Sequence, residues 1–314
     1  MRDKKTLSLT LLACFLWGSA FPTIKQLYEV MGIGNDFGVK MLLAGIRFIL
    51  AGIMILLYYR IRYKRNPLLS SLRDWQQVFL LGLFQTTFMY AFFYISIYNM
   101  SGVKTSVMSQ TSIFFVVIIA HYIYKDEKMH FGKVIGLLLG IAAIVIVNFN
   151  AFSHTEGLFE FRFNGEGFML ISNLFSAGST FWVKSLSKKM APVLLTAWQL
   201  LLGGVVLASV GLLTAKESLN FSHPATLPLL IYASLISSAA FTLWYSLLQS
   251  NKASELSMVR FTIPIIGTVL SVLLLPGESL TVNILFGLIL VVIGIWMCNR
   301  PRPFKARLIN ENEG

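Results

Sequence analysis

Long apolar runs with few or no charged residues recur along the whole chain, and short polar segments separate them. A helix that crosses the hydrocarbon core of a bilayer needs roughly 20 consecutive, mainly apolar residues. Runs of about that length occur ten times. We therefore predict ten membrane helices, over Thr6–Val30, Val39–Tyr59, Trp75–Tyr98, Val103–Tyr124, Phe131–Phe149, Gly167–Ser187, Pro192–Leu213, Leu227–Gln249, Glu255–Leu275 and Thr281–Asn299.

This pattern repeats within the chain. Residues 91–147 align without a gap with residues 242–298, at a constant offset of 151 residues. Repeated sets of membrane helices build several transporter folds, with the substrate site between the two copies. Identical pairs along the alignment include Tyr94 and Tyr245, Ser106 and Ser257, Thr111 and Thr262, Glu127 and Glu278, Gly136 and Gly287, and Ile144 and Ile295.

Five helices per copy is an odd number, so the second copy enters the membrane from the opposite side. The sequence thus predicts an all-α integral membrane protein with ten transmembrane helices in two inverted five-helix repeats. The first repeat is placed at residues 6–149, a connecting loop at 150–166, the second repeat at 167–299 and a cytoplasmic tail at 300–314. Composition agrees, because 56 % hydrophobic and 13 % charged residues lie far from the values of a soluble domain.

Lysine and arginine concentrate in alternate loops, and this distribution predicts the orientation of the chain. They precede the first span, crowd the loop after the second, and recur after the fourth, sixth and eighth spans and in the tail. Both termini are therefore expected in the cytoplasm, and the protein in the plasma membrane. Because the net charge of +12 is spread over these loops, no nucleic acid is expected as a partner. The expected partners are a small-molecule substrate and the lipid bilayer, and a homodimer is left open.

Several segments carry a family resemblance. The first span contains Trp17–Lys25 (WGSAFPTIK), the second contains Arg47 and Phe48 followed by small residues, and Glu127 and Glu278 each precede a glycine-containing last helix. Taken in order and with the repeat, these segments resemble the EamA family of the drug/metabolite transporter superfamily, over roughly residues 6–299. The resemblance implies ten helices in two inverted bundles and movement of small metabolites, often export of amino acids or related compounds.

Arg47 is the most informative polar residue inside a predicted span. It lies about eight residues into the second span, roughly 12 Å from its outer edge, where a charge needs a partner or an aqueous cavity. Its counterpart in the second repeat is Gln199. We predict that Arg47 binds a carboxylate or another anion and that Gln199 hydrogen-bonds the same ligand. The alternative is that Arg47 only braces the helix bundle.

Other charges lie nearer the ends of spans. Lys25 near the outer end of span one, Lys184 near the inner end of span six and Arg260 near the inner end of span nine are candidates for a gate or mouth, or for anchors at the membrane interface. Pro22 removes a backbone donor inside span one. It is therefore a candidate hinge, with a static kink as the alternative.

Aromatic and amide side chains within the spans are candidates for lining a cavity that holds organic solutes, since aromatic rings supply apolar area and Tyr and Trp also a polar group. The alternative is packing or, for the polar residues, hydrogen bonding between helices. The candidate substrate-binding residues added on this basis are Trp17, Tyr90, Gln110, Trp182 and Trp198.

The sequence shows no phosphate-binding loop for ATP and no histidine spacing typical of a metal site, so no cofactor, metal or catalytic residue is expected. The predicted function is a secondary transporter, by alternating access, that exports small organic metabolites such as amino acids. A phosphorylated-solute or nucleotide-sugar antiporter of the same superfamily is one alternative. A membrane-embedded enzyme is another, with His130 near Asp126 and Glu127 as its only support.

Overall fold

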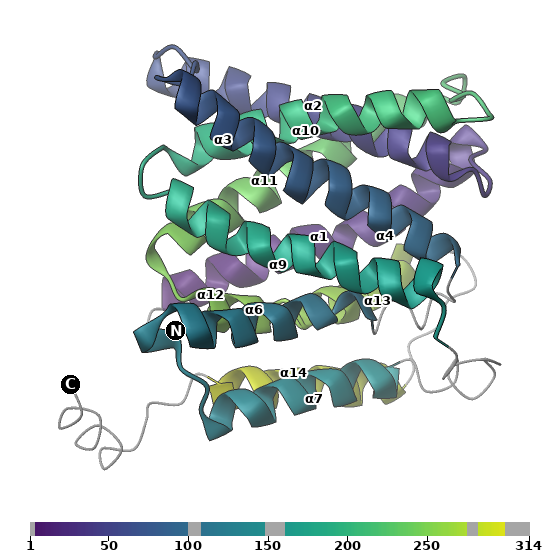
Figure 1. Ribbon diagram of the computed structural model, residues 1–314. Coiled ribbons are helices and arrows are strands. Elements are labelled where there is room, and N and C mark those ends of the chain that lie inside the picture. Colours follow the sequence, from purple (N-terminus) through teal and green to yellow (C-terminus); the bar gives the residue numbers. More distant parts are fainter. Residues whose placement is uncertain (1–3, 100–107, 148–160, 275–281, 299–314) are drawn as a thin grey trace.

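Helices account for all regular structure in the described part of the chain, residues 4–99, 108–147, 161–274 and 282–298 of this computed structural model (Figure 1). Their bounds follow the apolar runs closely, because each run ends at charged or turn-forming residues. The α-helices are α1 (Lys4–Met31), α2 (Phe37–Tyr63), α3 (Leu72–Gly82), α4 (Met89–Tyr98), α6 (Thr111–Ile123), α7 (Phe131–Val147), α9 (Phe168–Leu186), α10 (Pro192–Thr214), α11 (Thr226–Ser250), α12 (Ala253–Val259), α13 (Thr262–Leu274) and α14 (Val282–Cys298).

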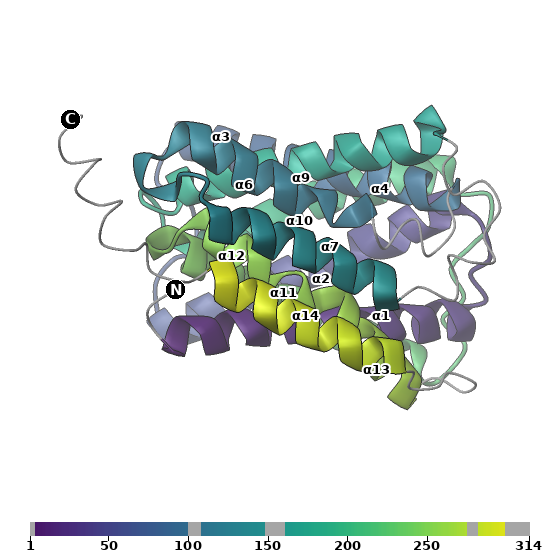
Figure 2. The same ribbon diagram turned by 90° about the horizontal axis from the view of Figure 1, so that it is seen from below.

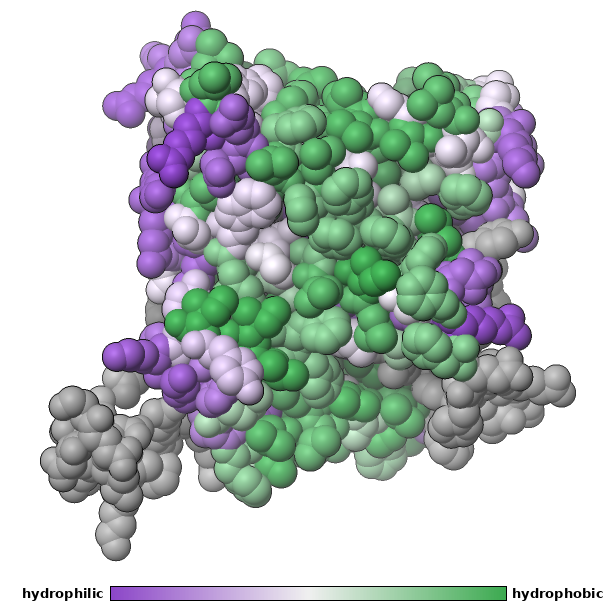
Figure 3. Space-filling model, in the orientation of Figure 1, coloured by the Kyte–Doolittle hydropathy of each residue, from purple (hydrophilic) through white to green (hydrophobic). Residues whose placement is uncertain are grey.

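In the described part of the chain, six helical stretches are long and apolar enough to cross a membrane. They are α1, α2, the stretch Leu72–Ser96, α10, α11 and the stretch Ala253–Leu274. Within the described residues α6, α7 and α14 are shorter apolar helices. Apolar side chains cover the middle of the face shown in Figure 3, and hydrophilic side chains gather at its two edges, where the helices end. This band is the distribution that a bilayer requires of a multi-pass protein.

Helices from the two halves of the sequence pack against one another rather than forming two separate bundles. α2 packs along α10, and α7 packs along α14; the second pair lies side by side in Figures 1 and 2. α1 packs on α11 and α13 of the second half, while α9 packs on α4 and α6 of the first. Each half therefore depends on the other for its buried surface.

Glycines bring α2 and α10 into backbone contact. A Cβ atom added at Gly38 would lie 2.5 Å from the amide nitrogen of Ala215, and one at Gly204 would lie 3.1 Å from the carbonyl oxygen of Gly45. Asp36 joins the same two helices at one end. Its carboxylate accepts a 2.8 Å hydrogen bond from Gly38 N, capping α2, and a 2.6 Å bond from Lys216 N beyond the end of α10.

The third apolar run contains a change of helix type that the hydrophobic pattern did not predict. Between α3 and α4 the backbone forms a π-helix, η1, over Leu83–Phe88. A π-helix has more residues per turn than an α-helix, so the angle between consecutive side chains is smaller. Here the polar residues Gln85, Thr86 and Thr87 are all buried, and they point into the protein instead of toward lipid.

Candidate functional site

A cavity of about 590 Å³ lies in the middle of the bundle. Helices of both halves line it: α1, α2, η1, α4 and α6 from the first, and α9, α11 and the α12–α13 segment from the second. α7, α10 and α14 contribute no lining residue and support the inner helices from behind. The volume lies in the range of pockets that bind small organic ligands.

Arg47 lines this cavity from α2. It lies ten residues after Phe37, about 15 Å along the helix, and only 7 % of its surface is exposed. Its guanidinium carbon lies 4.6 Å from the ring centroid of Phe48, and Tyr90 neighbours it across the cavity wall. Its Nε atom is buried and has no hydrogen-bond partner among the described residues. A guanidinium held in this way can bind an incoming anion.

Arg260 also lines the cavity, where the sequence analysis left open a place at its mouth or an anchor at the membrane interface. It occupies the short break between α12 and α13, and its guanidinium carbon lies 5.9 Å from the ring of Trp17 and 5.6 Å from that of Trp244. Its Nε atom, like that of Arg47, is buried without a hydrogen-bond partner in the described structure. The α-helical hydrogen bonding stops at this residue, which frees the side chain from the regular helix surface.

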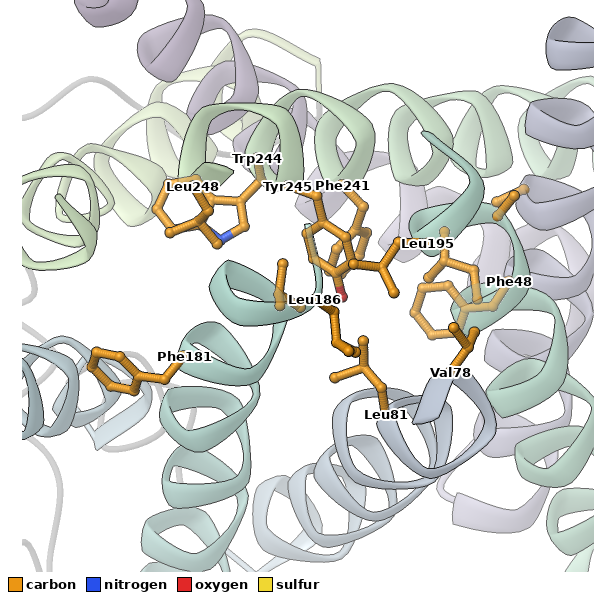
Figure 4. Close-up of a cluster of buried hydrophobic side chains, with 14 of the residues drawn as sticks. Phe48, Val78, Leu81, Phe181, Leu186, Leu195, Phe241, Trp244, Tyr245 and Leu248 are labelled. Atoms are coloured by element: carbon orange, nitrogen blue, oxygen red, sulfur yellow. The ribbon is translucent and has the colours of Figure 1, made fainter. Parts of the chain in front are cut away.

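Aromatic rings form much of the wall between these two arginines. Trp17 of α1 meets Phe241 and Trp244 of α11 at centroid distances of 5.4 and 5.5 Å in edge-to-face arrangements. Figure 4 shows that Phe241, Trp244 and Tyr245 project from one side of α11 into a core that also contains Phe48 of α2. The rings give the cavity rigid apolar surface.

Gln199 is not among the lining residues; it is fully buried behind the cavity wall. Its amide nitrogen donates to Thr86 of the π-helix, and its amide oxygen accepts a 3.0 Å hydrogen bond from the Tyr245 hydroxyl. Gln199 therefore orients Tyr245, which does line the cavity. The sequence predicted that Gln199 contacts the substrate, and it did not show that α10 contributes no described residue to the cavity lining.

The remaining sequence candidates divide between the cavity and its surroundings. Trp17, Tyr90 and Gln110 line the cavity. Trp182 instead donates a 3.0 Å hydrogen bond to Gln77, and Trp198 donates a 2.8 Å bond to the carbonyl of Pro67 and packs on Trp75. Lys25 is exposed on α1, and Pro22 is buried within a helix that continues on both sides of it. Trp182, Trp198, Lys25 and Pro22 are thus outside the cavity lining.

Lys184 forms a buried ion pair near the end of the cavity where Val183 lines it. Its Nζ lies 2.7 Å from Oε1 of Glu127, a carboxylate from the first half that is only 1 % exposed. Glu127 also accepts hydrogen bonds from Ala253 N at 3.1 Å, Ser254 N at 2.8 Å and Ser254 Oγ at 2.7 Å. The carboxylate therefore caps the first turn of α12, where a negative charge is stabilised.

Lys133 completes this cluster from α7. Its Nζ donates to the carbonyl oxygen of Glu127 at 2.8 Å and to Ser254 Oγ at 2.9 Å. Three elements, the turn after α6, α9 and α12, meet at the Glu127 carboxylate, and α7 joins them through the main-chain carbonyl of Glu127 and Ser254 Oγ. We call Glu127, Lys133, Lys184 and Ser254 the Glu127 cluster. The sequence analysis had placed Glu127 only at a span edge, and the counterpart of this residue, Glu278, lies outside the described residues.

Glu127 also predicts how stability responds to acid. Burial raises the pKa of this carboxyl, but the hydrogen bonds from Lys184 and Ser254 outweigh burial and hold it below the usual value of 4.5. Such a group contributes stability that is complete above the usual pKa and is lost as pH falls through the folded-state value. The melting temperature of the wild type is therefore expected to exceed that of Glu127→Gln at neutral pH and to approach it below about pH 4.5. A gap that stays constant down to about pH 3 would contradict this.

Two observations on the described residues concern metal binding and the enzyme alternative. The described residues contain no group of three His, Cys, Asp or Glu side chains that could hold a metal ion. The enzyme alternative rested on His130 acting with Asp126 or Glu127. Glu127 is committed to Lys184 and the start of α12, so its carboxylate is not free to act as a general acid or base.

Comparison with known proteins identifies the kind of protein to which this cavity belongs. The model of the EamA-like transporter family matches twice, over residues 4–149 and 163–300. The chain belongs to the EamA-like transporter family. The two matches cover nearly all of the described helices, so the cavity lies between two segments of the same family type.

Relatives of this EamA-like protein carry names of the same kind. An uncharacterized transporter of Archaeoglobus fulgidus is 27 % identical over 95 % of this chain and 100 % of its own length. The uncharacterized transporter YvbV of Bacillus subtilis is 25 % identical, with 98 % and 97 % covered. A WAT1-related chloroplastic protein of Arabidopsis thaliana is 24 % identical over 91 % of this chain and 67 % of its own.

The fold of this EamA-like protein has also been seen by crystallography. A solved structure superposes with a TM-score of 0.76 at 13 % identity, covering 94 % of this chain and 97 % of the other. At that identity the likeness shows the fold alone. The family, the apolar band and the named relatives together show that this protein is a multi-pass membrane transporter.

Proposed function

We propose that this transporter moves small organic metabolites that carry a carboxylate or a similar anionic group, amino acids among them, out of the cell by alternating access. The observation that carries the proposal is Arg47: a guanidinium with an unpartnered, buried Nε atom on the wall of a central 590 Å³ cavity. Charges inside a membrane protein are expensive and generally serve the substrate pathway. The aromatic wall suits the organic part of such a solute.

The arrangement of helices supports the alternating-access part of this proposal. The cavity lies where helices of the two sequence halves meet, and α1 and α9 are each packed mainly on helices of the other half. Inverted repeats arranged around a central site are a common basis for alternating access. We propose ten transmembrane helices in two inverted sets of five, with both termini in the cytoplasm of a cell whose plasma membrane holds the protein.

The Glu127 cluster is the proposed inner gate. It joins α9 and α12 to the turn after α6 on the side that the lysine-rich loops assign to the cytoplasm. Opening toward the cytoplasm would have to part Lys184 from Glu127, because the two side chains belong to different halves. This role agrees with the gate expected for Lys184, with Glu127 as the partner that sequence analysis did not supply.

Substitution of Arg47 by Gln tests the substrate site. In thermal-shift measurements on purified protein, a ligand that binds the folded state raises the melting temperature. The carboxylates that stabilise the wild type are expected to lose about tenfold or more in affinity in Arg47→Gln, since a charge-assisted hydrogen bond is lost. Efflux of the same solutes from proteoliposomes should fall in parallel.

The matched control is Arg62→Gln, which removes the same charge from the exposed end of α2 and should leave binding and efflux unchanged. Equal shifts for all three proteins would show that Arg47 is structural. Stabilisation only by cationic or neutral compounds would refute the anionic substrate class.

One observation favours a phosphorylated solute as the second candidate. Two arginines, Arg47 and Arg260, line the same cavity, as the antiporter alternative requires. Lys25 and Lys184, the other two cations near the ends of spans one and six, are not among the lining residues.

A further inference from the structure

A second cation, Arg260, lines the cavity. Binding of a single carboxylate by Arg47 gives this second cation no role. Arg260 contributes to the lining from the opposite half of the sequence to Arg47. Its Nε is buried without a hydrogen-bond partner, and no ion pair joins it to any described residue. A positive charge kept in this state inside a membrane protein is unfavourable unless water or a ligand compensates it.

The surroundings of Arg260 leave its charge available. The guanidinium lies beside the rings of Trp17 and Trp244, at 5.9 and 5.6 Å. Rings at these distances attract a cation and hold its plane in place. The rings do not neutralise the positive charge, and they accept no conventional hydrogen bond from the N–H groups at the edge of the guanidinium. The two tryptophans therefore fix the direction of the guanidinium and leave its N–H groups to a ligand.

The charge of the whole cavity points the same way. Among the described residues that line it, Arg47 and Arg260 are cationic and none is acidic. The other polar groups are hydroxyls and amides, such as Gln110, Asn173 and Ser237. Both arginines line the same cavity of about 590 Å³, so one solute in the cavity can reach both. A site with two fixed positive charges and no described acid compensates two negative charges.

We propose that Arg260, held by Trp17 and Trp244, forms a second anion subsite, and that the preferred substrate carries two negative charges. One negative charge binds Arg47 and the other binds Arg260, with the organic body against the aromatic wall. The two charges lie on separate carboxylates in a dicarboxylate and on two oxygens of one phosphate in a phosphate monoester. Dicarboxylates and phosphate monoesters share this chemistry. The inference rests on the proposed function, since it requires that Arg47 binds an anion.

Paired ligands that differ by one charge give a direct test with the full-length purified protein. The carboxylate pair is succinate and monomethyl succinate, and the phosphate pair is monomethyl phosphate and dimethyl phosphate, measured at mildly alkaline pH. For at least one pair, the dianion is expected to bind about tenfold or more tightly than its monoanion. Preference within the carboxylate pair assigns dicarboxylates, and preference within the phosphate pair assigns phosphate esters.

The variants separate this inference from the proposed function. Arg260→Gln should abolish the preference for the dianion and leave monoanion binding within about twofold of wild type. Arg47→Gln should weaken both members of a pair. If monoanions bind through Arg47 but no dianion binds better, the second subsite is refuted while the proposed function stands. If no anion binds the wild type, both fail.

A second variant, Arg260→Lys, tests the second subsite if Arg260→Gln does not fold. Arg260→Lys keeps the charge but loses the planar fork of donors, so it should retain part of the dianion preference. Arg62→Gln, the exposed control, should retain all of it. Equal preference in wild type, Arg260→Lys and Arg260→Gln would overturn the assignment of Arg260.

Discussion

Replacing Glu127 with Ala is expected to lower the free energy of unfolding by about 3–5 kcal/mol, because removing one partner of a buried ion pair leaves the other charge uncompensated. Lys184 would lose its only ion-pair partner among the described residues, and the amides of Ala253 and Ser254 would lose the carboxylate that caps α12. Denaturant titration in detergent measures this change. The Glu127 side chain joins the turn after α6 to α9 and α12.

A double-mutant cycle separates the ion pair from the rest of the cluster. Lys184→Met alone should destabilise the protein, while Lys184→Met combined with Glu127→Gln should lose less than the sum of the two single changes. Additive losses would show that the 2.7 Å contact between Lys184 and Glu127 contributes little. Glu255→Gln, near the same helix start but 21 % exposed at its side chain, is the control that should stay near wild type.

Gly45→Ala is expected to destabilise the pairing of α2 with α10 by about 2 kcal/mol or more, and Gly45→Leu to prevent accumulation of folded protein. The Cβ of an added side chain would lie 2.6 Å from the Cα of Ala208, and the neighbouring backbone is rigid helix. The two helices would have to separate along their length. Yield of monodisperse protein and the denaturation midpoint are the measurements.

Gly178→Ala is the matched control for this prediction. Gly178 lies in the interior of α9, and a Cβ atom added there meets nothing within 4 Å. Alanine should be neutral or stabilising by up to about 1 kcal/mol, because it restricts the unfolded chain more than glycine does. Similar losses at Gly45 and Gly178 would show that helix flexibility, not the close approach of α2 and α10, is responsible.

Much of the fold follows from apolar run length alone. The predicted spans Pro192–Leu213 and Leu227–Gln249 differ from α10 and α11 by one residue at most at either end, since polar or turn-forming residues stop each run. The π-helix in the third span was not predicted, because the apolar run of that span continues on both sides of Leu83–Phe88. The break at Arg260 was also missed, for α12 and α13 read as one run.

The candidate site was predicted less completely, for a physical reason. Depth along a span is visible in the sequence, and it singled out Arg47. The face that a helix turns toward its neighbours is set by packing, so Gln199, at similar depth, lies behind the cavity and not in it. Arg260 was expected near the inner end of span nine. In the structure it lies at a helix break, beside Trp17 and Trp244, and lines the cavity.

The Glu127 cluster has a consequence for how the protein is made. Lys184 follows Glu127 by 57 residues and Ser254 follows it by 127, so the ribosome completes the first half before any of these partners exists. During that interval the carboxylate is in the membrane-inserted chain without its ion pair or its helix start. Assembly of the Glu127 cluster therefore waits for synthesis of α12, and the first half of the chain is made while the cluster is still incomplete.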